Sequence, residues 1–473
     1  MRTHALVLGL LSFSAVAAFA AVDSWPAFRG PNSSGFSEPA RPPVKFGPTE
    51  NVLWSSDVPG TPSSPCVWGD RIFLTVFADG KLETRCYDRR DGKQLWSRVA
   101  PAEKLEEFHA TEGSPASATP ATDGQRVVSY FGSCGLFCHD FNGQELWRYT
   151  LPPAVTSGNF GSGTSPLIVG DLVVLNRDQS RDSSLLAVNL KTGKKAWETP
   201  RPDSPTSYGS PIAWKNGANE EIVLAGSLTV KAYDSKTGAE RWRVRGLPSF
   251  TCTTPVVGDG LLFFAGWSPG KSDSPWPSWE STLEKLDKNG DGVITLEEFT
   301  DKSAAAWFKA QDINGNGKLD REDWDTIGGQ MKKGENVMLA VKPGGSGDVT
   351  DTHVAWKFAR GLPYVPSALF YQGRVYVVKD GGMVSSVDAR NGQPFYTQER
   401  LNAAGSYYAS PVAADGRIYV VSLDGKVTVF KAGGDAPEIL HQVDFKERIA
   451  ATPALVGNHL YLRTATKLYA FGK

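Results

Sequence analysis

The chain has 473 residues, which is too long for one ordinary core domain, so we expect several domains or a repeated unit. Its formal net charge of −1 excludes a strong electrostatic attraction to nucleic acid or to anionic lipid. A hydrophobic fraction of 40%, with 49 glycines and 14 tryptophans, is typical of a globular protein rich in turns.

The first 20 residues have the pattern of a signal peptide. Basic residues at the start precede an apolar run over residues 5–18, and Ala18-Phe19-Ala20 forms a small-x-small cleavage site. We expect cleavage after Ala20 and export to the periplasm or the cell exterior; an uncleaved membrane anchor is the alternative. Residues 21–50 are interpreted as an N-terminal lead-in segment, and no later stretch is apolar enough to span a bilayer.

One pattern recurs from residue 51 to the end of the chain. Each copy begins with Ser or Thr followed by Pro, passes through a few apolar residues and a tight turn, and enters a strand rich in Val, Ile, Leu, Phe and Tyr. The starts are Ser64-Pro65, Thr119-Pro120, Ser165-Pro166, Ser210-Pro211, Thr254-Pro255, Ser410-Pro411 and Thr452-Pro453, with a degenerate copy at Pro366-Ser367.

The end of most copies carries a glycine followed four residues later by an aromatic residue. The pairs are Gly92 and Trp96, Gly143 and Trp147, Gly193 and Trp197, Gly238 and Trp242, and Gly392 and Tyr396. An Asp or Asn three or four residues before the glycine can hold the turn by bonding its own backbone. We expect the aromatic residue to fill the space between neighbouring units.

These repeats predict an all-β fold, an eight-bladed β-propeller of four-stranded antiparallel blades, because a single such sheet cannot bury both faces and must stack around an axis. The eighth copy, over residues 451–471, lacks a fourth strand because the chain ends. Residues 51–55, with Trp54, are expected to supply that strand and to close the ring.

A small α-helical insert, residues 268–335, interrupts the fifth copy. The strands expected on either side, 261–264 and 336–341, belong to one blade, so the insert is looped out of a hairpin, where insertions are tolerated. The propeller therefore comprises residues 51–267 and 336–473.

Two stretches of the insert match the calcium-binding loop of an EF-hand. Oxygen ligands without soft donors favour a hard cation such as Ca²⁺. In the first loop the ligands are Asp287, Asn289, Asp291, Val293 through its carbonyl, Thr295 and Glu298. In the second loop they are Asp312, Asn314, Asn316, Lys318 through its carbonyl, Asp320 and Asp323.

The second loop is expected to bind more weakly than the first. Asp323 is one methylene shorter than the usual Glu, and Asn316 removes a charge. The loops start only 25 residues apart, so residues 296–311 are expected to form one shared helix. We therefore expect calcium to stabilise the insert and do not expect the opening seen in sensor EF-hands.

Five cysteines follow the signal peptide, an odd number that leaves at least one free or paired between chains. The spacing of Cys134 and Cys138 is compatible with a local disulfide bridge and equally with two packed thiols. Two Gly-rich loops, 131–135 and 160–163, are candidates to line one face of the propeller.

The repeat ends resemble a known family. Thr192-Gly193 to Trp197 and Thr237-Gly238 to Trp242, each preceded by Asn or Asp, are similar to the signature of pyrroloquinoline-quinone-type propeller repeats. The resemblance covers residues 51–473 without the insert, and residues 25–30 also resemble the start of exported bacterial proteins of this class. It implies a BamB-like eight-bladed scaffold.

The resemblance also raises the alternative of a quinoprotein dehydrogenase that depends on pyrroloquinoline quinone. In such enzymes, it implies, the quinone and Ca²⁺ sit in the central funnel near a catalytic Asp and beside a disulfide between adjacent cysteines. No two cysteines are adjacent here, and the chain is short for that class. We therefore expect no bound pyrroloquinoline quinone and no catalytic residues.

The interpretation that the sequence favours is an exported, non-enzymatic binding or scaffold protein with Ca²⁺ in its EF-hand loops. Its expected partner is another envelope or secreted protein, or a polysaccharide, and not a nucleic acid. A structural module that docks onto such a partner through the insert is a further alternative.

Overall fold

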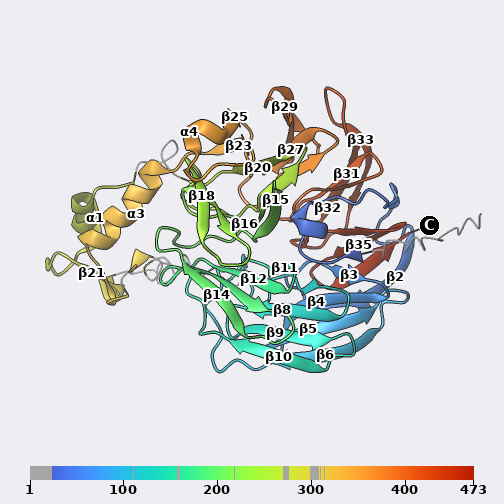
Figure 1. Ribbon diagram of the computed structural model, residues 1–473, viewed down its shortest axis with the longest axis horizontal. Helices are drawn as coiled ribbons and strands as arrows, with labels where there is room; N and C mark the ends of the chain where they lie inside the picture. Colours follow the sequence, from blue (N-terminus) through green and yellow to red (C-terminus); the bar gives the residue numbers. More distant parts are fainter. Residues whose placement is uncertain are drawn as a thin grey trace, which may run out of the picture.

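The computed structural model describes residues 24–109, 111–156, 160–217, 219–269, 276–298, 308, 311–313 and 315–472. Eight sheets follow one another around an axis in chain order, and each has the strand order of a propeller blade (Figure 1). The predicted fold class is confirmed. The expected signal peptide, residues 1–20, lies outside the described residues.

Each of the first four blades runs from an inner to an outer strand. Their strands are β3 (Cys66–Trp68), β4 (Arg71–Ala78), β5 (Lys81–Asp88) and β6 (Gln94–Ala100); β7 (Ala121–Thr122), β8 (Arg126–Phe131), β9 (Gly135–Asp140) and β10 (Glu145–Thr150); β11 (Leu167–Val169), β12 (Leu172–Arg177), β13 (Ser184–Asn189) and β14 (Lys195–Pro200); and β15 (Ile212–Asn216), β16 (Asn219–Ala225), β17 (Thr229–Asp234) and β18 (Glu240–Arg245).

The remaining blades repeat this order. Their strands are β19 (Val256–Gly258), β20 (Leu261–Gly266), β23 (Val337–Val341) and β25 (Val354–Phe358); β26 (Leu369–Tyr371), β27 (Arg374–Lys379), β28 (Met383–Asp388) and β29 (Pro394–Arg400); β30 (Val412–Ala414), β31 (Arg417–Val421), β32 (Lys426–Lys431) and β33 (Glu438–Asp444); and β34 (Ala454–Val456), β35 (His459–Arg463) and β36 (Lys467–Phe471).

The ring closes with a strand from the other end of the chain. β2 (Val52–Asp57) pairs antiparallel with β36 and becomes the outer strand of blade eight, as the sequence predicts. Two short strands extend other blades: β1 (Ser24–Trp25) pairs with β3, and β24 (Gly347–Asp348) pairs with β18. Because β2 completes blade eight, each of the eight blades in the described structure has at least four strands.

The Ser or Thr that starts each copy has a structural role that the sequence did not reveal. In every blade its backbone N–H donates to the hydroxyl oxygen of the equivalent residue in the next blade, at 2.9–3.0 Å. The circle runs through Ser64, Thr119, Ser165, Ser210, Thr254, Ser367, Ser410 and Thr452, and Thr452 donates back to Ser64. We call it the hydroxyl ring.

The Gly and Trp of the repeat ends lock neighbouring blades together. Trp197 on β14 donates its indole N–H to the carbonyl of Ser235 in the next blade at 3.2 Å. Gly238 has a φ of 73°, and a Cβ there would lie 2.4 Å from the Trp197 ring. Asp234 accepts the N–H of Thr237 at 2.9 Å. The expected roles of the aromatic residue and of the Asx turn are confirmed at this junction.

The insert leaves blade five between β20 and β23, which pair directly with each other. Its elements are α1 (Trp279–Leu286), β21 (Ile294–Thr295), the 3-10 helix η3 (Leu296–Glu298), β22 (Lys318–Leu319) and α3 (Arg321–Lys333). A further short helix, α4 (Thr350–His353), precedes β25. No helix in the described residues is long and apolar enough to cross a membrane.

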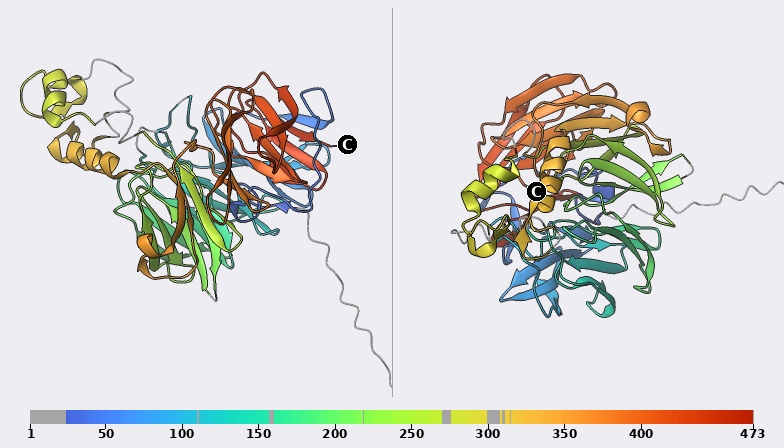
Figure 2. Two further views of the ribbon diagram at one scale, coloured as in Figure 1. Left: turned by 90° about the horizontal axis from the view of Figure 1, so that it is seen from above. Right: turned by 90° about the vertical axis from the view of Figure 1, so that its left-hand side faces the viewer.

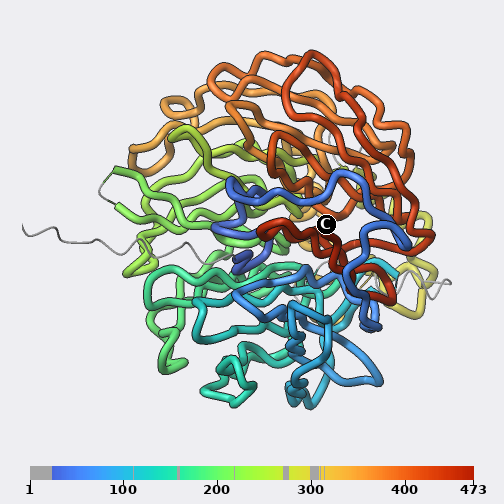
Figure 3. Tube along the Cα trace, turned by 90° about the vertical axis from the view of Figure 1, so that its right-hand side faces the viewer, coloured from blue at the N-terminus to red at the C-terminus, as the bar shows by residue number. Residues whose placement is uncertain are grey.

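The insert and the lead-in cover opposite ends of the propeller axis. Seen end-on, α3 crosses the middle of one face (Figure 2, right), and the N-terminal segment crosses the middle of the other (Figure 3). Besides its pairing with blade one through β1 and its bonds to Ala413 of blade seven, the lead-in, with the 3-10 helix η1 (Pro31–Ser33), bonds to four more blades. These bonds are Thr122 N–H to Pro26 O, Asn32 Nδ2 to Ala213 O, Arg29 Nη2 to Ala368 O and Arg41 N–H to Gly457 O.

Candidate functional site

The first EF-hand loop is folded around its own carboxylates. Glu298, at the last position, accepts the N–H groups of Lys288 at 2.9 Å and Thr295 at 2.7 Å. Asp287, at the first position, accepts the N–H of Gly292 at 3.0 Å, and Gly292 has the positive φ of 81° that the sharp turn requires. The backbone bond from Thr295 lowers the pKa of Glu298, so this carboxylate is ionised at neutral pH.

The second loop repeats this arrangement. Asp323 accepts the N–H of Ile313 at 3.0 Å and that of Asp320 at 3.3 Å, at the positions that Glu298 serves in the first loop. Asp312 accepts the N–H of Gly317 at 2.9 Å. The shorter Asp323 side chain therefore reaches the backbone amides at the equivalent positions of its own loop. It also completes a capping box with Asp320 at the start of α3.

The two loops are joined side by side. Ile294 on β21 pairs with Leu319 on β22, and both are buried beside Trp279 and Trp324. Asn314 lies outside the described residues, as does most of the expected shared helix over 296–311. In the described part of the chain, no group of three or more His, Cys, Asp or Glu side chains is gathered into a metal cluster. The carboxylates bond backbone amides instead, while carboxylate, amide and carbonyl oxygens at these positions are the donor set that fits Ca²⁺.

A chamber of about 520 Å³ lies on the propeller axis, where only the quinoprotein alternative had placed a ligand. Seven members of the hydroxyl ring line it. Phe28 of the lead-in segment lies at its wall, and Ile327, Gln330 and Met331 of α3, together with Ile313 of the second EF-hand loop, line it from the insert. The chamber is thus shared by the propeller and the insert.

One residue from each blade forms a second layer of the chamber wall. This residue stands two positions before the hydroxyl-ring residue, because alternate residues of an extended segment face the same side. The eight are Pro62, Ser117, Gly163, Tyr208, Cys252, Val365, Tyr408 and Ala450. Of the two Gly-rich loops that were candidates to line one face of the propeller, loop 160–163 lines the chamber and loop 131–135 is not among its lining residues. The other wall positions could have been found by counting back from each Ser or Thr start.

The described lining of the chamber carries little charge. It includes six aromatic side chains, which are Phe28, Phe160, Tyr208, Phe250, Tyr364 and Tyr408. Its only carboxylate is Glu112, which accepts the hydroxyl of Tyr408, and no Lys, Arg or His is among the described lining residues. Pyrroloquinoline quinone carries three carboxyl groups, so this lining does not fit that cofactor.

α3 is attached to the propeller at its C-terminal end. The Ser249 hydroxyl donates to the carbonyl of Gln330 at 3.0 Å, and the N–H of Glu335 donates to the carbonyl of Leu247 at 3.0 Å. Asp323 lies at the other end of this helix, so the second EF-hand loop and the chamber are connected through α3.

Glu106 lies behind the chamber wall. It accepts the backbone N–H of Ser162 at 3.0 Å and the Ser162 hydroxyl at 2.8 Å. Its other oxygen has no partner among the described residues. Burial raises the pKa of Glu106 to about 7, while the bonds from Ser162 and the charge of Arg177 oppose this effect.

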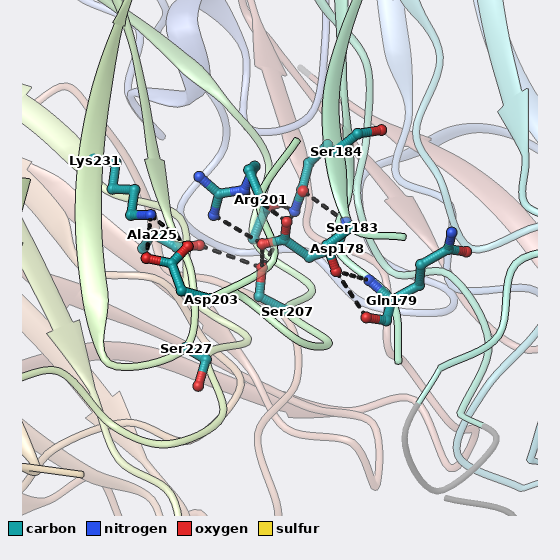
Figure 4. A network of polar contacts seen from close by, with 12 residues as sticks. Asp178, Gln179, Ser183, Ser184, Arg201, Asp203, Ser207, Ala225, Ser227 and Lys231 are labelled. Carbon is teal, nitrogen blue, oxygen red and sulfur yellow. Dashed lines mark hydrogen bonds and ion pairs between the residues drawn. The ribbon is translucent and has the colours of Figure 1, made fainter. Parts of the chain in front are cut away.

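A buried ion pair within blade three contacts blade four beside the chamber (Figure 4). Arg201 and Asp178 are both fully buried and make two parallel bonds of 2.7 and 2.9 Å. Ser207 donates to the same carboxylate at 2.6 Å, and Arg201 also donates to Tyr233 of blade four. Burial lowers the pKa of Arg201, but Asp178 outweighs this and raises it. The satisfied bonding indicates a structural role.

All five cysteines are free thiols in the structure. The alternative of a Cys134–Cys138 bridge is therefore wrong, and the packed-thiol interpretation holds. Both cysteines are buried; Cys134 directly precedes β9, and Cys138 lies within that strand. Only Cys252, in the chamber wall, is half-buried; the other four are buried.

Comparison with known proteins identifies the family of the propeller. Residues 78–245 and 347–472, more than half of the chain, match the family described as outer membrane protein assembly factor BamB. The chain belongs to this family. Residues 280–301 and 304–327 match the EF-hand family, which agrees with the two predicted loops.

Individual relatives are distant. The outer membrane protein assembly factor BamB of Burkholderia pseudomallei (strain K96243) is 22% identical over 408 residues, which cover 82% of this chain and 91% of that protein. BamB from Moraxella catarrhalis has a TM-score of 0.52 at 13% identity, over 89% of this chain and 98% of its own. Quinohemoprotein alcohol dehydrogenase from Comamonas testosteroni has a TM-score of 0.57 at 12% identity, over 95% and 80%. These two structural likenesses concern the fold alone.

Proposed function

We propose that this chain is an exported, non-enzymatic binding scaffold of the cell envelope that is stabilised by Ca²⁺ in its EF-hand insert. Membership of the BamB family supports the scaffold role and the envelope location. The observation that carries the proposal against a quinoprotein dehydrogenase is the axial chamber, whose described lining offers no cation to a carboxylated quinone. The expected partner is another envelope or secreted protein, or a polysaccharide.

Calcium in this proposal binds both EF-hand loops. Asp287, Asn289, Asp291, the carbonyl of Val293, Thr295 and Glu298 hold the first ion, and Asp312, Asn314, Asn316, the carbonyl of Lys318, Asp320 and Asp323 hold the second. The hydrogen bonds from backbone N–H groups to Glu298 and Asp323 keep both loops in the turn that gathers these oxygens. Calcium bound by these oxygens would neutralise the charge of the loop carboxylates, and so stabilise the insert.

Terbium luminescence tests the calcium sites. Tb³⁺ occupies calcium sites and is excited by nearby tryptophans, and Trp279 and Trp324 lie in the core of the insert. We expect luminescence on Tb³⁺ addition that Ca²⁺ displaces, and that is reduced in Asp287→Ala and Asp312→Ala. Asp325→Ala, an exposed carboxylate of α3 outside both loops, is the matched control. Equal luminescence in all three variants would refute these sites.

The scaffold role is tested by enzyme assay and by partner binding. Purified protein incubated with Ca²⁺ and pyrroloquinoline quinone should show no dye-linked alcohol oxidation; turnover would overturn the proposal. Binding of solubilised envelope proteins and of polysaccharide is then compared between the full chain and a variant without residues 268–335. Unchanged capture by that variant assigns the contact to the propeller, and lost capture assigns it to the insert.

A further inference from the structure

The axial chamber has the size and enclosure of a ligand site. Its volume of about 520 Å³ lies within the roughly 300–1,000 Å³ of small-molecule pockets. The lead-in segment and α3 cross the two faces of the ring, so the chamber lies between them (Figures 2 and 3).

The lining selects for an uncharged, aromatic occupant. Tyr208 and Tyr408 of the second wall layer, together with Phe160, Phe250 and Tyr364, present aromatic surface to the interior. An anion would be buried without a counter-charge among the described lining residues, which is costly. The one carboxylate, Glu112, already accepts a hydroxyl hydrogen.

The hydroxyl ring adds hydrogen-bond donors to this apolar space. Each ring oxygen accepts an N–H from a neighbouring blade, but none of the eight hydroxyls donates to a described residue. Seven of them line the chamber. Their O–H groups are therefore available to an oxygen atom of a ligand, such as a carbonyl or an ether.

We propose that the axial chamber binds an uncharged aromatic molecule that carries hydrogen-bond-accepting oxygen, and that the ligand enters past α3. Ile313 of the second EF-hand loop and Ile327 of α3 both line the chamber, and Asp323 accepts the Ile313 N–H at the start of α3. Calcium in the second loop then holds both isoleucines over the ligand; this coupling rests on the proposed calcium binding.

A pair of dyes tests whether the chamber prefers an uncharged aromatic ring system to a charged one. N-phenyl-1-naphthylamine is uncharged and aromatic, and 8-anilinonaphthalene-1-sulfonate has the same rings with a sulfonate. The full chain should bind the first at about one equivalent and the second at least about tenfold more weakly. Equal affinity for the two dyes would overturn the proposed selectivity.

Variants of the wall locate the dye. Val365→Trp fills the chamber from the second wall layer and should abolish binding of N-phenyl-1-naphthylamine, whereas Val365→Ala should keep it. Val99→Trp adds the same ring to the exposed face of β6 and should also keep it. Undiminished binding by a folded Val365→Trp protein would place the dye elsewhere and overturn the site.

Cys252 gives an independent measure that does not depend on tolerance of the Val365 variant. It is the one half-buried cysteine and lines the chamber, so N-ethylmaleimide should modify it before the four buried thiols. N-phenyl-1-naphthylamine should slow this modification, and Cys252→Ser should remove the fast phase. A modification rate that the dye leaves unchanged would also overturn the site.

The same reaction separates the two proposals. Ca²⁺ should slow Cys252 modification in the wild-type protein and in Asp287→Ala more than in Asp312→Ala. If Tb³⁺ and Ca²⁺ bind but the rate does not change, the coupling fails while the proposed calcium sites stand. If no cation binds, the proposed calcium role fails, and dye binding by the wild type still decides the chamber.

Discussion

Replacing Glu106 with Gln should change how the stability of the propeller depends on pH. Glu106 is 2% exposed, and one of its oxygens has no partner among the described residues. The charged group that acts on Glu106 is Arg177, which favours the ionised form of the Glu106 carboxyl. The nearby Tyr130 and Cys134 remain neutral because burial raises the pKa of each. Gln keeps a carbonyl oxygen that can accept the two bonds from Ser162.

The direction in which the free energy of unfolding changes with pH follows from the raised pKa of Glu106. Below pH 4.5, the ordinary value for Glu, the side chain is protonated in both the folded and the unfolded chain, and no penalty arises. Between 4.5 and about 7 the unfolded chain loses its proton first, so the free energy of unfolding falls as pH rises. Above pH 7 the buried carboxylate costs about 3 kcal/mol, at 1.36 kcal/mol for each pKa unit.

Urea unfolding midpoints measured from pH 4.5 to 8.5 test this reasoning. Wild type and Glu106→Gln should have similar midpoints at the acid end, and the variant should be more stable by up to about 3 kcal/mol at pH 8. Glu107→Gln, the exposed neighbour, is the matched control and should follow the wild type. Parallel curves for wild type and Glu106→Gln would refute the burial argument.

Three further substitutions test the packing within and between blades by the same unfolding measurement. Arg201→Ala leaves Asp178 buried without its counter-ion and should cost about 3–5 kcal/mol, and the double variant with Asp178→Ala should recover part of the loss. Gly238→Ala places a residue with a Cβ at positive φ and against the Trp197 ring, and should lower the free energy of unfolding by at least about 1–2 kcal/mol. A loss below a few tenths of a kcal/mol would contradict that packing. Thr119→Val removes one acceptor of the hydroxyl ring and should cost about 1–3 kcal/mol; an unchanged midpoint would show that the ring adds no stability.

The architecture was predictable because each blade repeats the same local chemistry. The turn at Asp234 and Gly238 and the aromatic Trp242 are short-range signals, and five copies in phase indicate a propeller. The closing strand was predictable for the same reason, since the eighth copy visibly lacks one. The EF-hand loops follow from fixed ligand spacing in a single stretch of chain.

The chamber was not predictable in the same way. Its wall combines one residue from every blade with α3 and the lead-in, and no short-range pattern shows that these segments meet. The bond from Arg29 to the carbonyl of Ala368 joins residues far apart in sequence. The sequence did contain part of the information. The Ser and Thr residues that start the copies form the hydroxyl ring, and the residue two positions before each of them lies in the chamber wall. The cysteine spacing left Cys134 and Cys138 undecided, because only the fold fixes their separation.

Calorimetric titration of the chelator-treated full chain, first with Ca²⁺ and then with pyrroloquinoline quinone, tests the central claim most directly. We expect heat of Ca²⁺ binding near two equivalents, from the loops that begin at Asp287 and Asp312, and no heat with the quinone. Tight quinone binding would contradict the chemistry of the uncharged chamber lining and make the dehydrogenase the leading interpretation.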